Sequence, residues 1–376
     1  MRPIQMVDTK SQYLKIKPAI DSAIQAVLDS AAYINGKPVH EFAAHLSNYL
    51  NVKHTIPCAN GTDALQIAMM ALDLQPGDEV ITPSFTYIAT TEVVALLRLK
   101  PVFVEVDPKT FCMDPESLRK AITPKTKAIV PVHLYGHAAP MEEIMQIANE
   151  FGLYVIEDNA QAIGCDYTFT NGTTQKTGTI GTIGATSFYP SKNLGAYGDG
   201  GALFTNDDAL AHKMKMIANH GQQKRYYHEM VGCNSRLDTL QAAVLNIKLD
   251  HLDEYSAARQ SVAAFYNKAF ANHPAVTTPF VASYSKHVYH QYTILLEGVD
   301  REGLNNYLSD KGIPSMIYYP VPGHRQQMFA GYDMSDYDLT VTDWLTERVI
   351  SLPVHTEMDH EQLSYITENI LNYLNG

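Results

Sequence analysis

One lysine, Lys192, lies in a segment that could hold a carbonyl ligand covalently. The segment SFYPSKNLGAYGDGG places it after strand-forming residues and before a loop with four glycines at positions 195, 198, 200 and 201. A lysine that forms a Schiff base must be held rigidly and must lose its proton readily. A strand end beside a glycine loop offers fixed geometry and room for a bulky planar ligand. The same segment is also compatible with a surface lysine in a polar turn.

A carboxylate at another strand end could serve the same ligand. Asp158 ends the apolar run in YVIEDNAQAIG, and open α/β sheets bind ligands at the carboxyl ends of their strands. A carboxylate there can pair with a protonated pyridine nitrogen, which keeps the ring of pyridoxal phosphate (PLP) able to accept electrons. Gln161 and His133 could reach the same face. The alternative is that Asp158 caps the turn that follows.

Two further segments could bind the phosphate and the ring of such a ligand. CANGTDALQIA contains a helix start at Asn60-Gly61-Thr62, where free N–H groups and the helix dipole favour a phosphate. Ser187, five residues before Lys192, could add a hydroxyl. In TPSFTYIAT, Tyr87, or with less support Phe85, could stack on the ring. The alternatives are an ordinary helix cap, a buried serine and core aromatics.

The elements around these residues predict an α/β fold. Several short apolar runs, rich in β-branched residues and flanked by turn residues, are typical of strands buried on both faces. Helical patterns between them, such as residues 141–150, indicate βαβ units and a mainly parallel sheet. The runs that predict strands are EVITP, KPVFVEV, KAIVPVHLYG, YVIED, ATSFY, GALFTN and HQYTILLE.

The hydrophobic pattern also predicts how the chain divides. Residues 237–255 form one long amphipathic stretch with apolar side chains three or four residues apart, which should link a large domain to a smaller one. We expect an N-terminal arm at 1–14, a large PLP-binding domain at 15–250 and a small C-terminal α+β domain at 251–376.

Composition excludes several classes of protein. The chain has 376 residues, is 45% hydrophobic and 18% charged, and has a net charge of −12. An acidic chain argues against nonspecific nucleic-acid binding. Its four cysteines are far apart, which argues against structural zinc or a disulfide framework. Neither a signal-peptide core nor a stretch of about 20 apolar residues is visible. We therefore expect a cytoplasmic protein that binds no metal and no membrane.

The order of these motifs resembles a known family. The segments NGTDAL, GDEVITPSFTY, VIEDNAQAIG, SFYPSKNLGAYGDGGA and GCNSRLDTLQAA are similar to the DegT/DnrJ/EryC1/StrS nucleotide-sugar aminotransferases, and the similarity covers nearly the whole chain. The block SKNLGAYGDGG is its most specific part. The resemblance implies a fold-type-I PLP enzyme, with a mainly parallel seven-stranded sheet between helices.

The resemblance also implies roles for individual residues. Lys192 would form the Schiff base, and Asp158 would bind the pyridine nitrogen. The asparagine of GCNSRLD would reach the phosphate bound by a partner subunit, which implies a homodimer with shared active sites. Other cofactor contacts would come from Gly61, Thr62, Tyr87, Gln161, Ser187 and Asn234.

Substrate contacts are implied at three positions. Arg236 could fork onto the carboxylate of a uronate or of the glutamate donor, or it could simply pair with Asp238. Tyr319 and His324 match the family's HYP-x-P-x-H motif. This chain has YYPVPGHR, in which Gly323 replaces a usual apolar residue.

The resemblance finally implies a reaction. Within the family, CANGTDALQIA and HGQQKRYYHEMVGCNSRLDTLQAA are most similar to members that act on UDP-2-acetamido-2-deoxy-3-oxo-glucuronate for O-antigen synthesis. We expect amino transfer from L-glutamate to this sugar. The alternative is 3- or 4-amination of a dTDP- or GDP-linked keto-deoxysugar.

Three other functions fit the sequence less well. Related dehydratases carry histidine at the position of Lys192. A nicotinamide-dependent enzyme would need G-x-G-x-x-G after an early strand, which the glycines at 178, 181 and 184 do not form. A non-catalytic PLP-binding regulator would need an effector segment, and no such segment is apparent.

Overall fold

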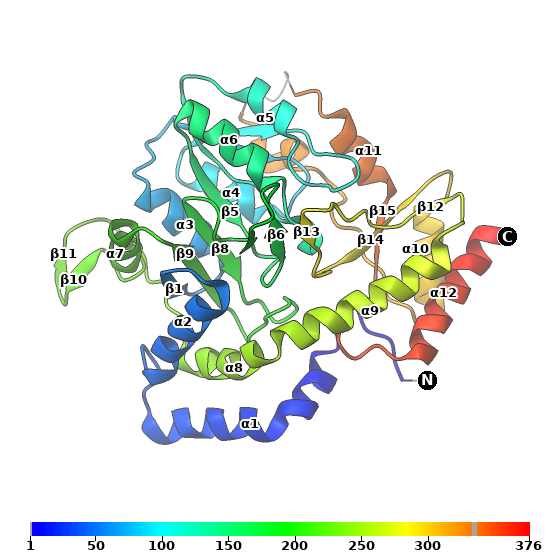
Figure 1. The fold of residues 1–376 in the computed structure, drawn as a ribbon, viewed down its shortest axis with the longest axis horizontal. Helices are drawn as coiled ribbons and strands as arrows, with labels where there is room; N and C mark the ends of the chain where they lie inside the picture. The colour runs from blue at the N-terminus through cyan, green and yellow to red at the C-terminus, as the bar shows by residue number, and fades with distance from the viewer. Residues whose placement is uncertain (1, 333–336) are drawn as a thin grey trace.

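The centre of the protein is a seven-stranded sheet in the order β1-β9-β8-β5-β4-β2-β3, shown in Figure 1. The computed structural model describes residues 2–332 and 337–376. β9 runs opposite to the other six strands, which are parallel to one another, so the predicted mainly parallel, seven-stranded sheet is confirmed. The strands are β1 (His54–Cys58), β2 (Glu79–Pro83), β3 (Lys100–Val104), β4 (Thr126–Ile129), β5 (Tyr154–Asp158), β8 (Ile183–Ser187) and β9 (Gly201–Thr205).

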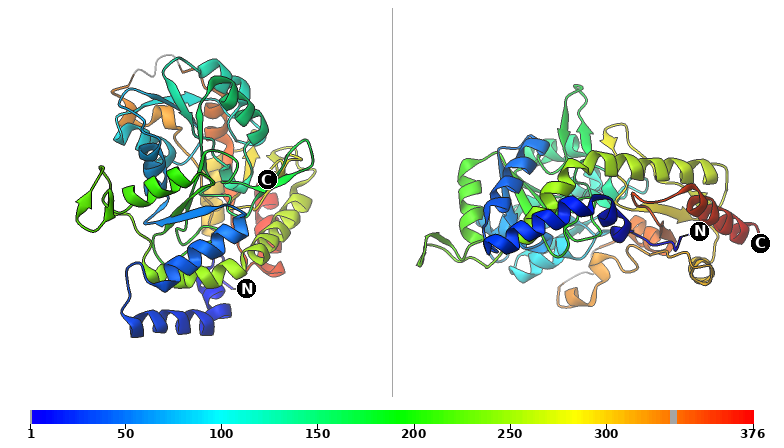
Figure 2. Two further views of the ribbon diagram at one scale, coloured as in Figure 1. Left: turned by 60° about the vertical axis from the view of Figure 1, so that its left-hand side comes forward. Right: turned by 90° about the horizontal axis from the view of Figure 1, so that it is seen from below.

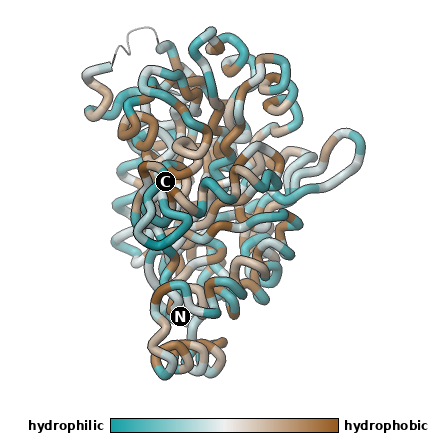
Figure 3. Tube along the Cα trace, turned by 90° about the vertical axis from the view of Figure 1, so that its left-hand side faces the viewer, coloured by the Kyte–Doolittle hydropathy of each residue, from teal (hydrophilic) through white to brown (hydrophobic). Residues whose placement is uncertain are grey.

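Helices cover both faces of this sheet. Successive side chains of a strand point to opposite faces, and β5 shows the result: Val155 packs into one hydrophobic cluster and Ile156 into another. The first cluster includes α5 and α6, and the second includes α3, α4 and α7. The hydropathy colours alternate along the peripheral coils in Figure 3, as expected for amphipathic helices. These helices are α3 (Gly61–Ala71), α4 (Ala89–Leu96), α5 (Pro115–Ala121), α6 (Met141–Phe151) and α7 (Asp208–Ile217).

The long amphipathic stretch predicted near residue 250 is two helices. α8 (Thr239–Asp250) packs against α1 (Thr9–Ser30) and α2 (Lys37–Leu50), and α9 (Leu252–Phe270) continues beyond His251 into the C-terminal part. The domain boundary expected after residue 250 would lie at the end of α8, and it stays a prediction. The break occurs because α8 must follow the large sheet, while α9 packs against a separate core.

The C-terminal part has its own small sheet and core. Its strands are β12 (Val276–Thr277), β14 (Tyr292–Leu296) and β15 (Val349–Leu352). Helices α9, α10 (Arg301–Asp310) and α12 (His360–Asn375) cover this sheet, and Ile4 of the N-terminal arm joins the core. Asp359 begins α12 with a capping box to Gln362. The preceding helix, α11, spans Thr340–Arg348.

Short elements connect and extend these layers. β6 (Asp166–Thr168), β7 (Thr174–Lys176) and β13 (Ser285–Lys286) form a further three-stranded sheet. The hairpin of β10 (Gln222–Lys224) and β11 (Tyr227–His228) projects from the body, as Figure 2 shows. Short 3-10 helices in the described part of the chain span Leu134–Gly136, Gly323–Arg325 and Gln327–Phe329. None of the helices described is long and apolar enough to cross a membrane.

Candidate active site

Strand ends and helix starts surround a cavity of about 710 Å³. This is where parallel strands of an open sheet are expected to bind a ligand. The structure brings eight of the predicted site residues to its wall, from segments more than 250 residues apart in the chain. They are Gly61, Thr62, Tyr87, Asp158, Gln161, Ser187, Lys192 and Tyr319. Asn234, Arg236 and His324 do not line it.

Lys192 lies in the loop between β8 and β9, half-buried in the cavity wall. Its backbone N–H donates to the Tyr189 carbonyl at 2.8 Å, which fixes the turn. Its Nζ has no hydrogen-bond or salt-bridge partner among the described residues. Burial lowers the pKa of Lys192 to about 8, although the charge of Asp158 opposes this shift. A large neutral fraction near pH 8 makes the amine a competent nucleophile, which a surface lysine would not be.

Asp158 is buried and held by two hydrogen bonds. Its Oδ2 accepts from Thr90 Oγ1 at 2.7 Å, and its Oδ1 accepts from the Ala160 N–H at 3.1 Å. The second bond caps the following turn, as the alternative interpretation of this residue expected, and the contact of Asp158 with a pyridine nitrogen stays a prediction. Thr90 Oγ1 also lies 3.2 Å from Thr86 Oγ1. A threonine hydroxyl has one proton; when Thr90 donates to Asp158, it must accept from Thr86.

The start of α3 forms a cradle with unused donors. The Asn60 side chain accepts from the Asp63 N–H at 2.8 Å, which is the expected helix cap. The N–H groups of Gly61 and Thr62 have no partner among the described residues. A side chain at Gly61 would collide with Ser187, because its Cβ would lie 2.7 Å from the serine Cβ. This bare backbone, at a helix N-terminus beside a hydroxyl, fits a phosphate group.

The structure distinguishes the two aromatic residues that could stack on a ligand ring. Phe85 is 1% exposed and packs in the core against Phe111, whereas Tyr87 is 55% exposed and lines the cavity. The centroids of the Tyr87 and Tyr319 rings lie 6.0 Å apart. A flat ligand between the phosphate cradle and Lys192 would therefore meet Tyr87 and not Phe85.

Gln161 and Tyr319 form one hydrogen-bonded unit. The Tyr135 N–H donates to Gln161 Oε1 at 2.7 Å, so Gln161 Nε2 is directed to the Tyr319 hydroxyl at 2.9 Å. Burial raises the pKa of Tyr319 well above its ordinary value, which keeps its hydroxyl protonated. His133 does not join them, because it is fully buried against Glu157.

Sequence reasoning missed several polar residues that line the cavity, among them Asp199, His290 and Gln291. The imidazole of His290 lies 3.5 Å from the Gln291 amide nitrogen, and its Nδ1 is buried without a partner. Burial, then the charges of Lys192 and Arg259, hold the pKa of His290 well below its ordinary value. The only sequence signal was HQ at the start of a predicted strand, which does not indicate which element it faces.

Asn234 and Arg236 lie in an extended segment beside the phosphate cradle. Ser235, between them, accepts the Ala59 N–H at 3.0 Å. Asn234 is exposed, and Arg236 makes no ion pair with Asp238 in the described structure. The segment therefore passes the cradle without turning either side chain into the cavity of its own chain.

His324 is placed outside the cavity by its loop. Its Nδ1 lies 2.7 Å from Ser84 Oγ, and Asp343 lies 3.8 Å from its Nε2. Gly323 explains the departure from the family motif: its Cβ would lie 2.9 Å from the Phe103 ring and 3.2 Å from the Ser84 carbonyl. Phe103 therefore occupies the space that an apolar residue at 323 would fill.

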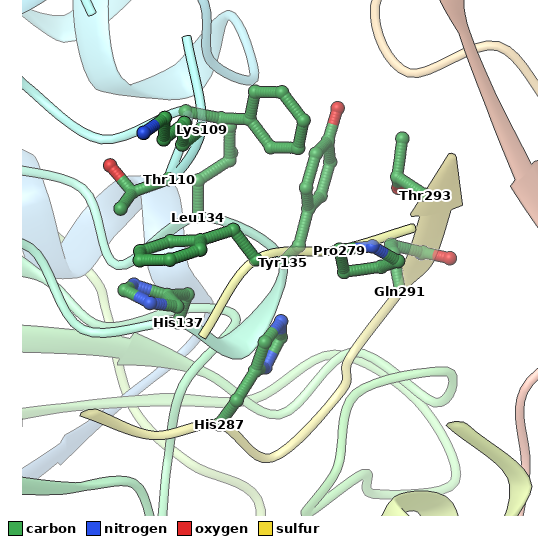
Figure 4. A pocket seen from close by; sticks show the side chains of 11 residues that line it. Lys109, Thr110, Leu134, Tyr135, His137, Pro279, His287, Gln291 and Thr293 are labelled. Atoms are coloured by element: carbon green, nitrogen blue, oxygen red, sulfur yellow. The ribbon is translucent and has the colours of Figure 1, made fainter. Parts of the chain in front are cut away.

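A second, much smaller cavity adjoins the site. It has about 10 Å³, room for one water molecule, and Figure 4 shows Tyr135, His287, Gln291 and Thr293 around it. Gln291 lines both cavities. This space is too small for a substrate, so the larger cavity is the candidate active site.

Comparison with known proteins agrees with this geometry. The model of the DegT/DnrJ/EryC1/StrS aminotransferase family matches residues 14–371. A Pseudomonas aeruginosa protein named UDP-2-acetamido-2-deoxy-3-oxo-D-glucuronate aminotransferase is 46% identical, over 98% of this chain and 100% of that protein. A Geobacillus stearothermophilus protein named pleiotropic regulatory protein is 44% identical over 98% of both chains. Other relatives have names that refer to UDP-, dTDP- or GDP-linked sugars.

Solved structures give the same result. The crystal structure of S. venezuelae DesV matches all of both chains with a TM-score of 0.95 and 37% identity. Fold and site together define a fold-type-I, PLP-dependent aminotransferase. The chain belongs to the DegT/DnrJ/EryC1/StrS aminotransferase family.

Proposed function

We propose that this enzyme moves an amino group from L-glutamate to UDP-2-acetamido-2-deoxy-3-oxo-glucuronate, giving a 3-amino sugar for surface polysaccharide. The observation that carries the proposal is the 46% identity, over nearly the whole of both chains, to the P. aeruginosa enzyme of that name. The cavity supports it, because it combines a nucleophilic lysine, a buried carboxylate and a phosphate cradle in a space large enough for a cofactor.

The residues of the cavity suggest a division of roles. When bound, PLP supplies a ring that accepts the charge formed as the amino donor loses its α proton. Lys192 would hold the cofactor covalently and, once released, take up and return that proton. Asp158 would hold the proton on the pyridine nitrogen. The N–H groups of Gly61 and Thr62, with Ser187, would bind the phosphate, while Tyr87 covers one face of the ring.

Asn234 and Arg236 are proposed to act in the active site of a partner subunit. Their segment passes the phosphate cradle but does not line the cavity of its own chain. The nearby hairpin and the residues that follow it leave Tyr226, Tyr227 and Val231 exposed, as expected for a surface that a second copy covers. We also place the enzyme in the cytoplasm, which its four free cysteines support.

Mixing two inactive variants tests the dimer. Lys192→Ala lacks the nucleophile, and Asn234→Ala lacks the contact proposed to cross the interface. A hybrid dimer of the two would contain one intact site, so randomly mixed chains should recover about a quarter of wild-type activity. No recovery after verified exchange of chains would show that Asn234 acts in its own subunit.

The first test of the reaction is the visible spectrum of the PLP-loaded protein. L-glutamate should bleach the cofactor band, and the 3-oxo-glucuronate sugar should restore it. Bleaching without return would keep the aminotransferase and discard this sugar as substrate. The same experiment with UDP- or dTDP-linked keto sugars that lack the carboxylate distinguishes the alternatives.

Substitution of Arg236 shows which carboxylate it binds. A bidentate, charge-assisted contact contributes about 2–3 kcal/mol, or roughly 30- to 150-fold. If Arg236 binds the uronate, Arg236→Gln should raise the KM for that sugar by this factor and leave bleaching by glutamate unchanged. If it binds the donor, the bleaching step changes instead. An unchanged rate in both steps would remove Arg236 from the site.

The relative named as a regulatory protein supports a second candidate function. A protein that only senses PLP would bind the cofactor through Lys192 and would not turn over any keto sugar. Bound cofactor that glutamate cannot bleach would favour this function over amino transfer.

A further inference from the structure

A second cluster of polar atoms lies beside α9, apart from the cavity wall. Eight buried side-chain atoms of the described residues have no hydrogen-bond partner, and four of them belong to this cluster. Each of the four residues is at least nine-tenths buried. Buried polar atoms normally bind the protein or an ordered water molecule, so these four atoms are available to bind a ligand. They are Tyr255 Oη, Ser256 Oγ, Arg259 Nε and His355 Nε2.

Two segments bring these residues together. Ser256 and Tyr255 precede Arg259 by three and four residues on α9, so each of them neighbours Arg259 on the surface of the helix. Arg259 Nη1 donates to the Val354 carbonyl at 2.7 Å, which places the next residue, His355, beside it. Burial, and then the charge of Arg259, lower the pKa of His355 to about 4.

All four unpartnered atoms can donate a hydrogen bond. The Glu357 N–H donates to His355 Nδ1 at 3.1 Å, so the neutral ring must carry its proton on Nε2. Arg259 Nε is a donor in every state, and the two hydroxyl groups can turn their protons toward a ligand. A water molecule must also donate its own two protons, whereas an anion accepts from all four groups.

The charge of the region favours an anion as well. Arg259 has no carboxylate partner in the described structure, because its Nη1 is used by the backbone carbonyls of Tyr289, His290 and Val354. Burial lowers the pKa of Arg259 to about 10, which leaves it charged at neutral pH. The neighbouring Lys248 is also buried, and its ammonium group bonds only the Gly195 carbonyl.

Two acids near His355 are already engaged. Glu357 pairs with Lys15 at 2.6 Å, and Asp8 accepts the Ser11 N–H at 2.9 Å. Neither carboxylate forms a hydrogen bond with Arg259 Nε. A buried cation without a counter-charge is costly, and a small bound anion would remove that cost.

We propose that Tyr255, Ser256, Arg259 and His355 form a buried site for a small monovalent anion such as chloride. The anion would hold α9 to the segment that follows β15. Because Arg259 also binds the carbonyl of His290, which lines the active-site cavity, the bound anion would steady that wall of the cavity.

Bromide tests the site directly. Crystals of the PLP-loaded enzyme soaked in sodium bromide should show an anomalous peak at hydrogen-bond distance from Arg259 Nε and His355 Nε2. Arg301 is an internal control: its Nε is also unpartnered and its Nη1 also binds backbone carbonyls, but Glu302 lies 3.8 Å from its guanidinium. Peaks at both arginines, or ordinary water at Arg259, would overturn the proposal.

A solution measurement gives an independent answer. Replacing sodium chloride by sodium methanesulfonate at equal ionic strength should lower the Tm by a few degrees, because the larger anion cannot enter. Ser256→Ala should lose at least half of this difference. Ser261→Ala is the matched control, since its exposed hydroxyl bonds only the Ala257 carbonyl of the same helix. Equal Tm values of the wild type in both salts would overturn the proposal.

Discussion

The hydrogen bond from Thr90 to Asp158 should be worth one to two orders of magnitude in the rate of amino transfer. The bond is 2.7 Å long, fully buried, and ends on the carboxylate proposed to hold the pyridine nitrogen. Thr90→Val keeps the shape of the side chain and removes the hydroxyl. Asp158 Oδ2 then loses its fixed position, and Thr86 loses the acceptor for its own hydroxyl.

The expected size follows from the chemistry of this bond. Hydrogen bonds to charged groups contribute about 1.5–3 kcal/mol, which corresponds to roughly 10- to 150-fold in rate if the whole effect falls on the transition state. Thr90→Ser retains the donor and should remain within about threefold of the wild type, since only a methyl group is lost.

The assay is the rate at which L-glutamate bleaches the bound cofactor in a single turnover. This half-reaction excludes effects on sugar binding and on product release. Cofactor content and Tm are measured in parallel, so that a loss of PLP is not mistaken for slow chemistry. A Thr90→Val variant within threefold of the wild type would refute the reasoning, as would an equal loss in Thr90→Ser.

Three further predictions concern Lys192 and the residues packed around the site. PLP-free enzyme should react with PLP with a midpoint near pH 8, the pKa of Lys192, because only the neutral amine attacks; a midpoint near 10.5, the pKa of a free lysine, would contradict this. Glu157→Gln should lower the free energy of unfolding by about 3 kcal/mol. The carboxylate accepts four hydrogen bonds, and an amide can accept only half of them. A loss of less than about 1 kcal/mol, measured by urea titration, would argue against this prediction. Gly323→Val should cost about 1–3 kcal/mol by collision with Phe103. Gly331→Ala should be neutral, because its added Cβ would meet no atom of the described residues within 4 Å. Equal urea midpoints for the two variants would contradict the packing argument.

Much of the fold could be predicted because each buried strand is marked locally. EVITP and YVIED coincide with β2 and β5, and the helix predicted at residues 141–150 is α6. The sequence did not reveal that β1 belongs to the sheet or that β9 runs antiparallel, because both depend on a pairing between segments far apart. The break at His251 was missed since the apolar spacing continues through it.

The site also contains residues that the local sequence indicates and residues that meet only through the fold. Lys192 and Asp158 stand at strand ends, where local sequence signals their position. Thr90 lies inside a helix and reaches Asp158 only through the fold, and Gln161 meets Tyr319 across 158 positions of the chain. No pattern along one segment can indicate such contacts. The roles assigned to all of these residues remain predictions.

The position of β9 limits how early the phosphate cradle can form while the chain is being synthesised. β1 is an edge strand whose only partner in the sheet is β9, and about 140 residues separate the two in the chain. At roughly 5–20 residues per second, the ribosome needs roughly 7–30 s to deliver that partner. Until then the start of α3, which β1 leads into, lacks the close packing of Asn60 against Gly201. The phosphate cradle is therefore completed after the lysine loop has emerged, and cofactor capture must be a late event in the maturation of each chain.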